Sequence, residues 1–509
     1  MLSLFDQGPP PPCPADFNLA AHVLARGETL PDRIALEIVG PETRERWSFA
    51  RLIAAVRGAG TGLLACGLSP GDAVLLRLGN TVEFPVAFLG AIAAGLVPVP
   101  TSAQLTAPEV DRIAAEIRPA LIIAGERVAL PLAPACPILT GADLTAMSDL
   151  PPCDWHRGDA GRPAYMIYTS GTSGQPRAVV HAHRAILARA MMHQGWYGLT
   201  GADRLLHAGA FNWTYTLGTG LLDPWTLAAT ALVPVAGTPA ADLGALLARS
   251  GTTIFAASPG IYRQMLRTEL PALPRLRHAL SAGEKMPEAL RTAWYAATGT
   301  MIFEAFGMSE CSTFVSASPA RPAPPGTIGF PQTGRRIAVL DAAGNPVPVG
   351  ATGQLAVARS DPGLFLGYFG DREETEHRFH GEWFLTGDSF QMAADGALSF
   401  LGRDDDMMNA GGFRVSPLEV EAAMARFPGL TECAATELRV SATASVIACF
   451  YTSAAPLEDA ALADHAASCL ARYKQPRIFV RVPALPLGSN NKISRRSLRQ
   501  AWEAEHDPS

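Results

Sequence analysis

The chain has 509 residues, of which 48% are hydrophobic and 17% are charged, and its formal net charge is −6. Disordered proteins are rich in charge and poor in apolar side chains, so this composition excludes them. The 47 glycines and 42 prolines show no period, which excludes collagen. A negative chain has no global positive field for a nucleic acid, and we predict no nucleic-acid partner. At roughly 150 residues per domain, the length predicts about three domains' worth of chain.

The cysteines and the apolar segments bear on the compartment. The eight cysteines are dispersed without CxxC spacing, which argues against a disulfide scaffold or a zinc site and favours a reducing cytoplasm. The opening segment, MLSLFDQGPPPPCP, has neither a basic nor a long apolar region and is not expected to be a signal peptide. The most apolar run, Phe84–Pro100, is short for a membrane span and has prolines near both ends. We interpret it as a buried helix followed by a buried strand, and predict no membrane span.

The first 150 residues alternate between helix and strand patterns. Ala20–Arg26 and Phe49–Cys66 are amphipathic, whereas Gly71–Leu78 and Ala120–Ala124 are typical of buried strands. Such alternation predicts a parallel sheet with helices on its faces.

The pattern of apolar, turn-forming and charged residues changes twice towards the carboxyl end of the chain. Ala323–Ala358 contains short apolar runs with glycine and proline turns, which predicts a compact β subdomain. After the charged break at Gly402–Asp406, the last hundred residues predict a separate small α+β domain. Its expected elements are a helix from Pro417, strands near Cys433 and Val446, a helix over Leu457–Arg472 and a strand over Arg477–Val482.

The sharpest local pattern is YTSGTSGQPRAVVHAH, Tyr168–His183, which follows the strand-like AYMIY. Glycines let backbone N–H groups approach phosphate oxygens, and hydroxyls add further donors. Arg177 supplies a fixed positive charge, and a helix from about His183 is expected to add a weak dipole. We therefore predict a phosphate-binding loop, with an ordinary Ser/Gly surface loop as the alternative; it is not a Walker A loop. Its candidate donors are Thr169, Ser170, Gly171, Thr172, Ser173 and Gly174.

This segment resembles the signature of the adenylate-forming synthetases, which is close to YTSGTTGxPKG. That family includes acyl- and aryl-CoA ligases, luciferases and peptide-synthetase adenylation domains. The chain departs from the signature at Arg177, where lysine is usual, and at Ala178, where glycine is usual. Arginine keeps the positive charge and can bridge two phosphate oxygens, so we expect the function of the loop to survive.

Further segments resemble the family in its own order: SAGEKMP at Ser281–Pro287, FEAFGMSE at Phe303–Glu310, and Thr386-Gly387-Asp388. The resemblance implies an adenine pocket, a metal-binding acid and a ribose contact. In that scheme Gly283, Glu284 and Lys285 line the adenine pocket, Phe306 and Gly307 flank the base with Phe306 stacked on it, Ser309 adds a hydroxyl, Glu310 binds Mg²⁺, and Asp388 accepts from the ribose hydroxyls.

The match at Gly402–Glu421, GRDDDMMNAGGFRVSPLEVE, is the most specific, and a final one lies in PLGSNNKISRRSLR from Pro486. The usual glycine before the catalytic lysine is Asn491 here, and asparagine tolerates a left-handed backbone better than most residues. The roles that the resemblance implies are a second ribose contact for Arg403, a hinge for Asp405, a CoA passage for Gly411 and Gly412, a phosphate contact for Arg414 and catalysis for Lys492.

The resemblance also implies the fold and the reaction. The fold would be α/β, with a large N-terminal domain of two α/β subdomains and a small β subdomain (residues 1–402), and a small mobile α+β C-terminal domain (residues 403–509). The reaction would be that of an AMP-forming acyl-CoA synthetase, in which a carboxylic acid, ATP and CoA give acyl-CoA, AMP and pyrophosphate through an acyl-adenylate. ATP, Mg²⁺ and CoA would be required, with no redox cofactor, and Lys492, Arg177 and Glu310 would be catalytic.

An acyl pocket is expected near Gly209–Gly220, GAFNWTYTLGTG, and near Cys311–Phe314. Relatives that activate amino acids usually carry FDxS, whose aspartate holds the substrate ammonium, but this chain has FNWT. Asn212 has no charge to pair with an ammonium, so an α-amino acid is disfavoured and an aromatic, alicyclic or short- to medium-chain acid is expected. The candidate pocket residues are Phe211, Asn212, Trp213, Tyr215, Thr313 and Phe314, with core packing as the alternative for Trp213 and Tyr215.

Other functions stay open at this point. A stand-alone adenylation enzyme would load the phosphopantetheine of a carrier protein supplied in trans. A luciferase-like oxygenase is compatible with the fold, since fold does not fix function. The departures at Arg177 and Asn491 also leave open a non-catalytic nucleotide-binding relative. A homodimer is neither predicted nor excluded.

Overall fold

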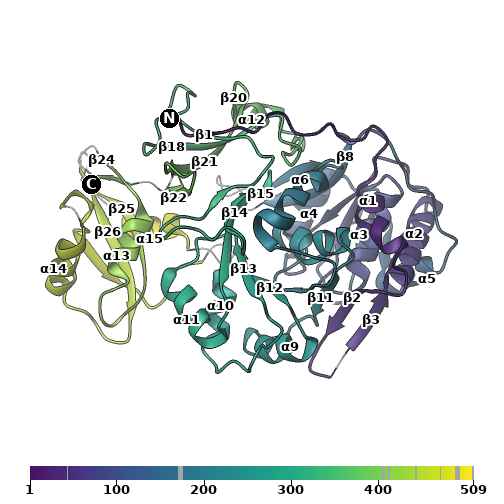
Figure 1. The fold of residues 1–509 in the computed structure, drawn as a ribbon, viewed down its shortest axis with the longest axis horizontal. Coiled ribbons are helices and arrows are strands. Elements are labelled where there is room, and N and C mark those ends of the chain that lie inside the picture. Colours follow the sequence, from purple (N-terminus) through teal and green to yellow (C-terminus); the bar gives the residue numbers. More distant parts are fainter. Residues whose placement is uncertain are drawn as a thin grey trace. The chain divides into compact units, whose positions relative to one another are not determined.

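The computed structural model describes residues 1–42, 44–169, 176–403, 406, 408–410, 413–441, 444–470, 472–487 and 493–506. The backbone divides into two compact units (Figure 1). The large unit comprises Phe5–Arg336 and Ala358–Glu382, and the small unit comprises Met1–Leu4, Ile337–Val357 and Trp383–Ser509.

The large unit is built on three sheets. The first has nine strands in the order β16-β15-β14-β13-β12-β10-β11-β2-β3, parallel from β14 to β2 and antiparallel at both edges. The second, β5-β4-β6-β7, is entirely parallel, and the third, β19-β9-β8, is antiparallel. The strands are β2 (Ile34–Val39), β3 (Arg44–Ser48), β4 (Ala73–Arg77), β5 (Val97–Pro100), β6 (Leu121–Ala124), β7 (Ile138–Thr140), β8 (Pro163–Thr169), β9 (Arg177–Ala182), β10 (Arg204–His207), β11 (Thr230–Pro234), β12 (Ile254–Ala257), β13 (His278–Ala282), β14 (Ile302–Met308), β15 (Ser312–Ser316), β16 (Phe330–Pro331) and β19 (Gly367–Tyr368).

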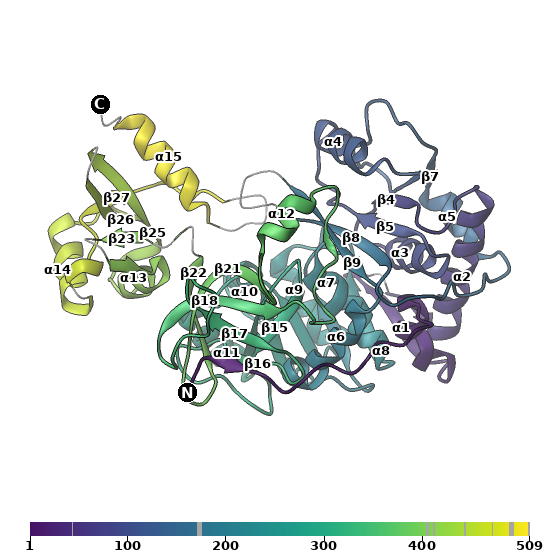
Figure 2. The same cartoon turned by 90° about the horizontal axis from the view of Figure 1, so that it is seen from above.

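The helices expected among the first 150 residues are present, and their ends follow local chemistry. The side chain of Asn18 accepts a hydrogen bond from the Ala21 N–H at the start of α1, and Ser48 does the same for Arg51 at the start of α2. The main helices of this unit are α1 (Leu19–Glu28), α2 (Phe49–Ala65), α3 (Glu83–Ala93), α4 (Ala107–Ile117), α5 (Gly141–Ser148), α6 (Ala185–Met192), α9 (Leu243–Ser250), α10 (Pro259–Met265), α11 (Glu288–Thr298) and α12 (Arg372–His377). Figure 2 shows α2, α3 and α5 gathered around β4 and β5.

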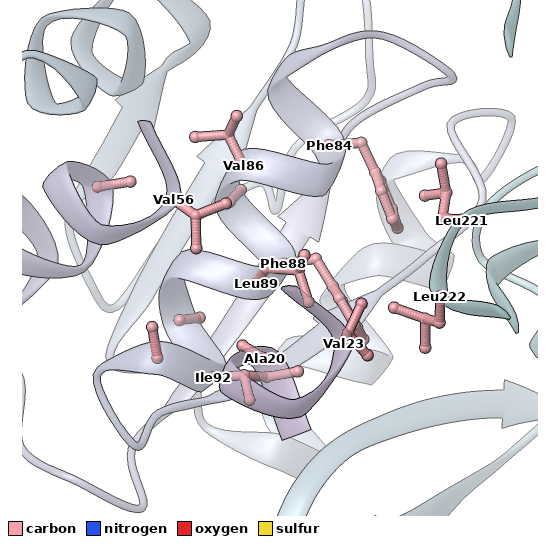
Figure 3. Packing of buried hydrophobic residues seen from close by; sticks show 14 of the residues in the cluster. Ala20, Val23, Val56, Phe84, Val86, Phe88, Leu89, Ile92, Leu221 and Leu222 are labelled. Carbon is pink, nitrogen blue, oxygen red and sulfur yellow. The ribbon is translucent and has the colours of Figure 1, made fainter. Parts of the chain in front are cut away.

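The apolar run at Phe84–Pro100 forms α3 and β5, as predicted. The side chains of Phe84, Phe88 and Ile92 point from α3 towards α1, α2 and the Leu221–Leu222 segment (Figure 3). Phe88 and Ile92 are 1% and 0% exposed, because α3 is apolar on every side and is enclosed by its neighbours. None of the helices in the described part of the chain is long and apolar enough to cross a membrane.

The helix predicted from about His183 is present, but the dipole it was expected to add at the glycine-rich loop is not. The loop joins two antiparallel strands, β8 and β9, with Thr169 opposite Arg177, so a strand and not a helix follows it. The predicted helix exists as α6 but begins at Ala185, beyond β9. Six strand residues span about 20 Å. Since the field of a helix dipole falls off within its first turn, α6 adds no dipole at the loop.

The small unit begins with the predicted β subdomain, in which β17 (Ile337–Leu340), β18 (Thr352–Ala358), β21 (Trp383–Met392) and β22 (Leu398–Arg403) form antiparallel pairs. The α+β pattern of the last hundred residues is confirmed. β26 pairs antiparallel with β25 and parallel with β27. The elements here are β23 (Met408–Ala410), β24 (Phe413–Val415), α13 (Pro417–Met424), β25 (Leu430–Ser441), β26 (Ala444–Ser453), α14 (Asp459–Cys469), β27 (Ile478–Arg481) and α15 (Arg495–Glu505).

Candidate active site

Segments predicted to bind adenine and the acid follow three parallel strands of the nine-stranded sheet. Gly209–Tyr215 follows β10, Gly283–Lys285 follows β13, and Phe306–Glu310 lies at the end of β14 and just beyond it. These three strands are parallel members of one sheet. Carboxyl ends of parallel strands share one edge, which is where open α/β sheets bind ligands. The structure therefore brings the predicted segments to a single edge of the sheet.

The candidate adenine segment is held by a buried carboxylate. Ala282 on β13 pairs with Ala305 on β14. The next residue of each strand, Gly283 and Phe306, therefore lies beside the other. Gly283 has a φ of +94°, which favours glycine. Glu304 accepts a hydrogen bond from the Met286 N–H at 2.9 Å and pairs with Arg291. Burial raises the pKa of the Glu304 carboxyl although Arg291 acts against that rise.

Phe306, the predicted stacking residue, is half-buried at the end of β14. Its ring meets Phe314 edge to face, with centroids 5.5 Å apart. The next residue, Gly307, sits at an irregularity in the β14–β15 ladder. A Cβ at Gly307 would lie 2.2 Å from the Ser312 carbonyl oxygen, so only glycine fits there. This close approach fixes the turn that carries Ser309, which is half-buried, and Glu310, which is buried.

The predicted phosphate-loop cation and the predicted metal-binding acid meet at one tyrosine. The guanidinium carbon of Arg177 lies 5.2 Å from the Tyr368 ring centroid, and the Tyr368 hydroxyl donates to Glu310 Oε1 at 2.7 Å. Arg177 Nη1 also donates to Glu374 Oε1 at 2.6 Å. Burial, reinforced by the Glu310 carboxylate, raises the pKa of Tyr368, which keeps its proton on the hydroxyl. We call Arg177, Glu310, Tyr368 and Glu374 the Tyr368 cluster.

The Tyr368 cluster fits a magnesium ion that is shared with a phosphate. Tyr368 uses only one oxygen of Glu310, and among the described residues no donor binds Oε2. The described ranges hold no group of three or more His, Cys, Asp or Glu side chains able to cage a metal. Mg²⁺ prefers one or two carboxylates together with substrate phosphates, and it neutralises developing phosphate charge when bound. A single buried glutamate close to Arg177, the predicted phosphate-binding cation, is consistent with that preference.

The residues predicted for the acyl pocket divide into two groups. Phe211 is 3% exposed and packs against Phe84 with ring centroids 4.9 Å apart, while Thr313 and Phe314 are also buried. These three side chains belong to the packed interior. Asn212, Trp213 and Tyr215 are half-buried where the chain leaves β10. This half-buried group has accessible surface that an acid can contact.

A buried ion pair supports the turn from the side of α6. Arg189 binds Asp223 through two hydrogen bonds of 2.9 and 2.6 Å, and a third nitrogen donates to the hydroxyl of Ser312. Arg189 is 4% exposed and Asp223 is fully buried. Ser312 has a φ of +61°, a left-handed conformation that is unusual for serine. The ion pair therefore anchors a residue two positions after Glu310.

The other predicted site residues lie in the small unit or outside the described residues. Asp388 and Arg403, the predicted ribose contacts, are directly opposite each other on β21 and β22. Arg414 lies on β24, and nothing is described of its side chain. Ser170, Gly171, Thr172, Ser173, Gly174, Asp405, Gly411, Gly412 and Lys492 lie outside the described residues.

Sequence reasoning missed Tyr368, Glu374 and Arg189. Tyr368 and Glu374 lie nearly two hundred residues after Arg177, and Glu374 is separated from Arg177 by 197 positions in the sequence. The available signal was the acidic run DREETE, Asp371–Glu376, which begins two residues after the apolar LFLGYF and places a tyrosine close in sequence to concentrated negative charge. Arg189 and Asp223 gave no local signal, because an ion pair between two helices has no fixed sequence spacing.

A buried histidine beside this site predicts a pH dependence of stability. His181 on β9 stacks on Tyr165 with ring centroids 4.8 Å apart, and both of its ring nitrogens are buried. Burial lowers the pKa of His181 to about 3, and the same cause lowers those of His183 and His207 to about 3. Each histidine is thus neutral in the folded chain at pH values where the unfolded chain binds a proton.

We expect the free energy of unfolding to fall as the pH is lowered from about 6.5 towards 3. In that window the unfolded state binds more protons, and each such histidine contributes a slope of about 1.4 kcal/mol per pH unit. His181→Phe, which keeps a ring over Tyr165, should reduce the slope by one histidine's share. Urea unfolding measured between pH 4 and 7 tests this, with His377→Phe on α12 as the control; an unchanged slope in His181→Phe would contradict it.

Comparisons with known proteins agree with this geometry. A family model described as AMP-binding enzyme matches residues 24–369, and one described as AMP-binding enzyme C-terminal domain matches residues 419–492. The chain belongs to the AMP-binding enzyme family. The predicted family and α/β fold are therefore confirmed, and the chain is an AMP-forming acid–CoA ligase of this family.

Relatives within the AMP-binding family match along nearly their full length. Human mitochondrial acyl-coenzyme A synthetase ACSM2B is 30% identical, over 96% of this chain and 92% of the relative. Benzoate–CoA ligase of Thauera aromatica is 28% identical, over 98% and 99% of the two chains. Among solved structures, the anthranilate CoA ligase AuaEII in complex with anthranoyl-AMP has a TM-score of 0.86 at 27% identity, covering 96% of this chain and 98% of that one. A benzoate CoA ligase from Burkholderia xenovorans LB400 has a TM-score of 0.82 at 27% identity, covering 95% and 100%.

Proposed function

We propose that this AMP-forming ligase activates an aromatic, alicyclic or short- to medium-chain carboxylic acid and transfers it to CoA. The observation that supports this most is the Tyr368 cluster. One buried tyrosine contacts both Arg177, a cation from the glycine-rich hairpin, and Glu310, an acid from the β14–β15 turn. These two residues are 133 positions apart in the sequence (310 − 177). Attack on the α-phosphate of ATP requires positive charge at the phosphates, held in advance of the reaction.

Each proposed role follows from what its side chain can do. Arg177 would neutralise the departing phosphates, and Glu310 would hold Mg²⁺ against them. Phe306 offers an aromatic face to adenine, and the Asp388 carboxylate can accept from both hydroxyls of ribose. Lys492 would place a positive charge at the acid carboxylate and the α-phosphate. With the two anions neutralised in this way, the carboxylate can attack and pyrophosphate can leave.

The substrate class is argued from the segment after β10. Asn212, in place of the aspartate usual for amino-acid substrates, offers no partner for an ammonium group. Trp213 and Tyr215 are half-buried aromatic side chains at the same place, suited to a compact apolar acid. Relatives named benzoate–CoA ligase and a neighbour bound to anthranoyl-AMP support an aromatic acid as the first choice.

We propose CoA as the thiol acceptor and a reducing compartment, the cytoplasm, as the location. All eight cysteines are free, which agrees with a reducing environment, although the ACSM relatives are named as mitochondrial. A carrier protein supplied in trans is the alternative acceptor. CoA-dependent product formation separates the two acceptors.

The contact between Arg177 and Glu374 predicts an effect on ATP binding. If Arg177 binds phosphate, it exchanges its bond to Glu374 for one to ATP, so the carboxylate opposes binding. We expect Glu374→Gln to lower the KM for ATP by about two- to fivefold, the value of a partly exposed ion pair. Initial rates at varied ATP concentrations measure this effect. Glu376→Gln is the matched control, because Glu376 lies two residues away on α12 and pairs with Arg359 instead. A rise in the KM for ATP in Glu374→Gln would contradict the role of Arg177.

The proposed function is tested by product analysis with a panel of acids. The purified chain, ATP, Mg²⁺ and CoA would be incubated with benzoate, hydroxybenzoates, anthranilate, cyclohexanecarboxylate, and straight-chain acids of graded length. We expect AMP and the matching acyl-CoA in equal amounts, detected by chromatography and mass spectrometry. Release of pyrophosphate without AMP or thioester would leave the acyl group on the nucleotide and would point to a carrier acceptor. Absence of AMP with every acid would overturn the proposal.

A further inference from the structure

A basic pocket lies in the large unit, apart from the residues described above. Its volume is about 430 Å³, and five arginines line it. The arginines are Arg44, Arg46, Arg204, Arg249 and Arg275, and the remaining lining residues are small and uncharged. Its lining residues come from β3, the start of β10, the end of α9 and the segment before β13; β3 and α9 are labelled in Figure 1.

The pocket lies at the opposite ends of strands that lead to the candidate active site. Arg204 begins β10, and Arg275 lies three residues before β13 begins. Ser250 and Gly251 end α9 and precede β12. The proposed acid and adenine segments instead follow the carboxyl ends of β10 and β13. Strands of four or five residues separate the two edges by about 15 Å, so this is a second location.

The pocket carries an excess of positive charge. The only carboxylate paired with its arginines among the described residues is Glu37, which binds Arg44, Arg46 and Arg204. Burial alone would raise the pKa of Glu37, but hydrogen bonds from Arg204 and Arg44 hold it below its usual range. Glu37 is therefore ionised at neutral pH, and five positive charges face one negative charge. The pocket is therefore positively charged, although the whole chain has a net charge of −6.

Several of these cations are fixed in position before any ligand binds. Arg204 donates from Nε to the Ser250 carbonyl at 2.9 Å and from Nη2 to Glu37 at 2.8 Å. Gly251 has a φ of +64°, and a Cβ there would lie 3.4 Å from Arg275 Cδ and 4.0 Å from Arg204 Nε. The tight end of α9 thus brings Arg204 and Arg275 close together. Glu37 holds Arg44 and Arg46 on the neighbouring strand.

Two arginines have no carboxylate partner. Arg249 and Arg275 are exposed and make no ion pair with any residue in the described part of the chain. Because Glu37 is already bound to three arginines, an incoming anion would meet Arg249 and Arg275 unpaired. Guanidinium groups bind phosphate oxygens in pairs, more strongly than neutral donors do.

We propose that this pocket binds a small molecule that carries two or more phosphate groups. The cavity volume lies within the range of small-ligand sites. A free anion is favoured over a lipid headgroup because the lining contains no large apolar side chain for an acyl chain to contact. The site is separate from the residues of the reaction proposed above.

The test is calorimetric titration with inorganic tripolyphosphate at fixed ionic strength. Tripolyphosphate can also bind at the proposed active site, so variants assign the events. We expect one binding event to weaken about a hundredfold in Arg249→Gln/Arg275→Gln, since each of the two lost charge-assisted contacts costs about tenfold. The matched control is Arg112→Gln/Arg267→Gln, which removes the same charge from exposed positions that do not line the pocket.

The outcomes distinguish a specific binding site from nonspecific attraction of anions by positive surface charge. Unchanged affinity in Arg249→Gln/Arg275→Gln would overturn the proposal, and so would equal weakening in the control. Binding of wild type should also weaken as salt is raised, and an affinity independent of salt would contradict a site built from arginines. Vesicles containing phosphatidic acid form a second arm; capture of vesicles without tripolyphosphate binding would assign the pocket to a membrane surface and overturn the small-anion proposal. Pyrophosphate exchange should be the same in both double variants, so loss of the proposed function cannot be mistaken for loss of this site.

Discussion

Replacing Lys492 with alanine is expected to slow acyl-adenylate formation by about a hundred- to a thousandfold, the usual cost of losing one positioned charge in a transition state. The acid and ATP are both anions, and their reacting groups must come together before a bond forms. The family resemblance assigns Lys492 to the position where its ammonium would meet both. Thioester formation from pre-made acyl-adenylate does not bring these two anions together, so we expect it to be nearly unchanged.

The measurement compares the two half-reactions in the same preparation. Adenylation is followed by release of pyrophosphate in a single turnover, and thioester formation by supplying purified acyl-adenylate and CoA. Lys474→Ala is the control, because Lys474 is also a C-terminal lysine but its Nζ lies 2.5 Å from Glu419 Oε1. An equal loss in both half-reactions, or a similar adenylation defect in Lys474→Ala, would remove Lys492 from its proposed role.

The second large effect is expected on stability. Arg189→Met would leave the Asp223 carboxylate fully buried without its cation, and breaking such a pair costs about 3–5 kcal/mol. Burial alone would raise the pKa of Asp223, but Arg189 holds it low, so the carboxylate is charged in the wild type. Tyr197 also donates to Asp223 at 2.8 Å, and it would be the main remaining donor. One neutral hydroxyl cannot replace a guanidinium that makes two bonds.

The double variant Arg189→Met/Asp223→Leu provides the internal comparison. It removes both charges, and paired hydrophobic replacements of a buried ion pair are often close to neutral. We therefore expect it to be more stable than Arg189→Met alone. Trp196 and Trp225 are fully buried, so tryptophan fluorescence follows the loss of the folded state during urea unfolding. If Arg189→Met unfolds at the wild-type urea concentration, the pair does not hold the turn that follows Glu310.

The elements predicted from sequence were those whose signal is local. The apolar run of α3 and β5 and the amphipathic patterns of α1 and α2 each lie within one segment, and the structure has elements there. The strand that directly follows the glycine-rich loop was not predicted, for a reason that is not local. Residues 177–182, RAVVHA, form a strand because β8 and β19 supply its partners from both sides. Tertiary pairing thus determined a segment whose own sequence is ambiguous.

In the candidate site, too, residues within short motifs were predicted, whereas contacts between distant residues were not. Motifs indicated Arg177 and Glu310 separately, because each stands in a short recognisable segment. The contact that joins them runs through Tyr368, which was not predicted, since its partners are 58 residues away at Glu310 and farther still at Arg177. Likewise, sequence could place Phe211 in an aromatic segment, but only packing against Phe84 shows that its ring is part of the interior.

Isotope exchange between labelled pyrophosphate and ATP tests the central claim most directly, because it requires only reversible adenylation and no thiol. With Mg²⁺ and a suitable aromatic, alicyclic or short- to medium-chain acid, we predict label in ATP that depends on the acid and disappears in Lys492→Ala. If no acid in a broad panel drives the label into ATP, the chain does not form acyl-adenylates and the proposed reaction is wrong.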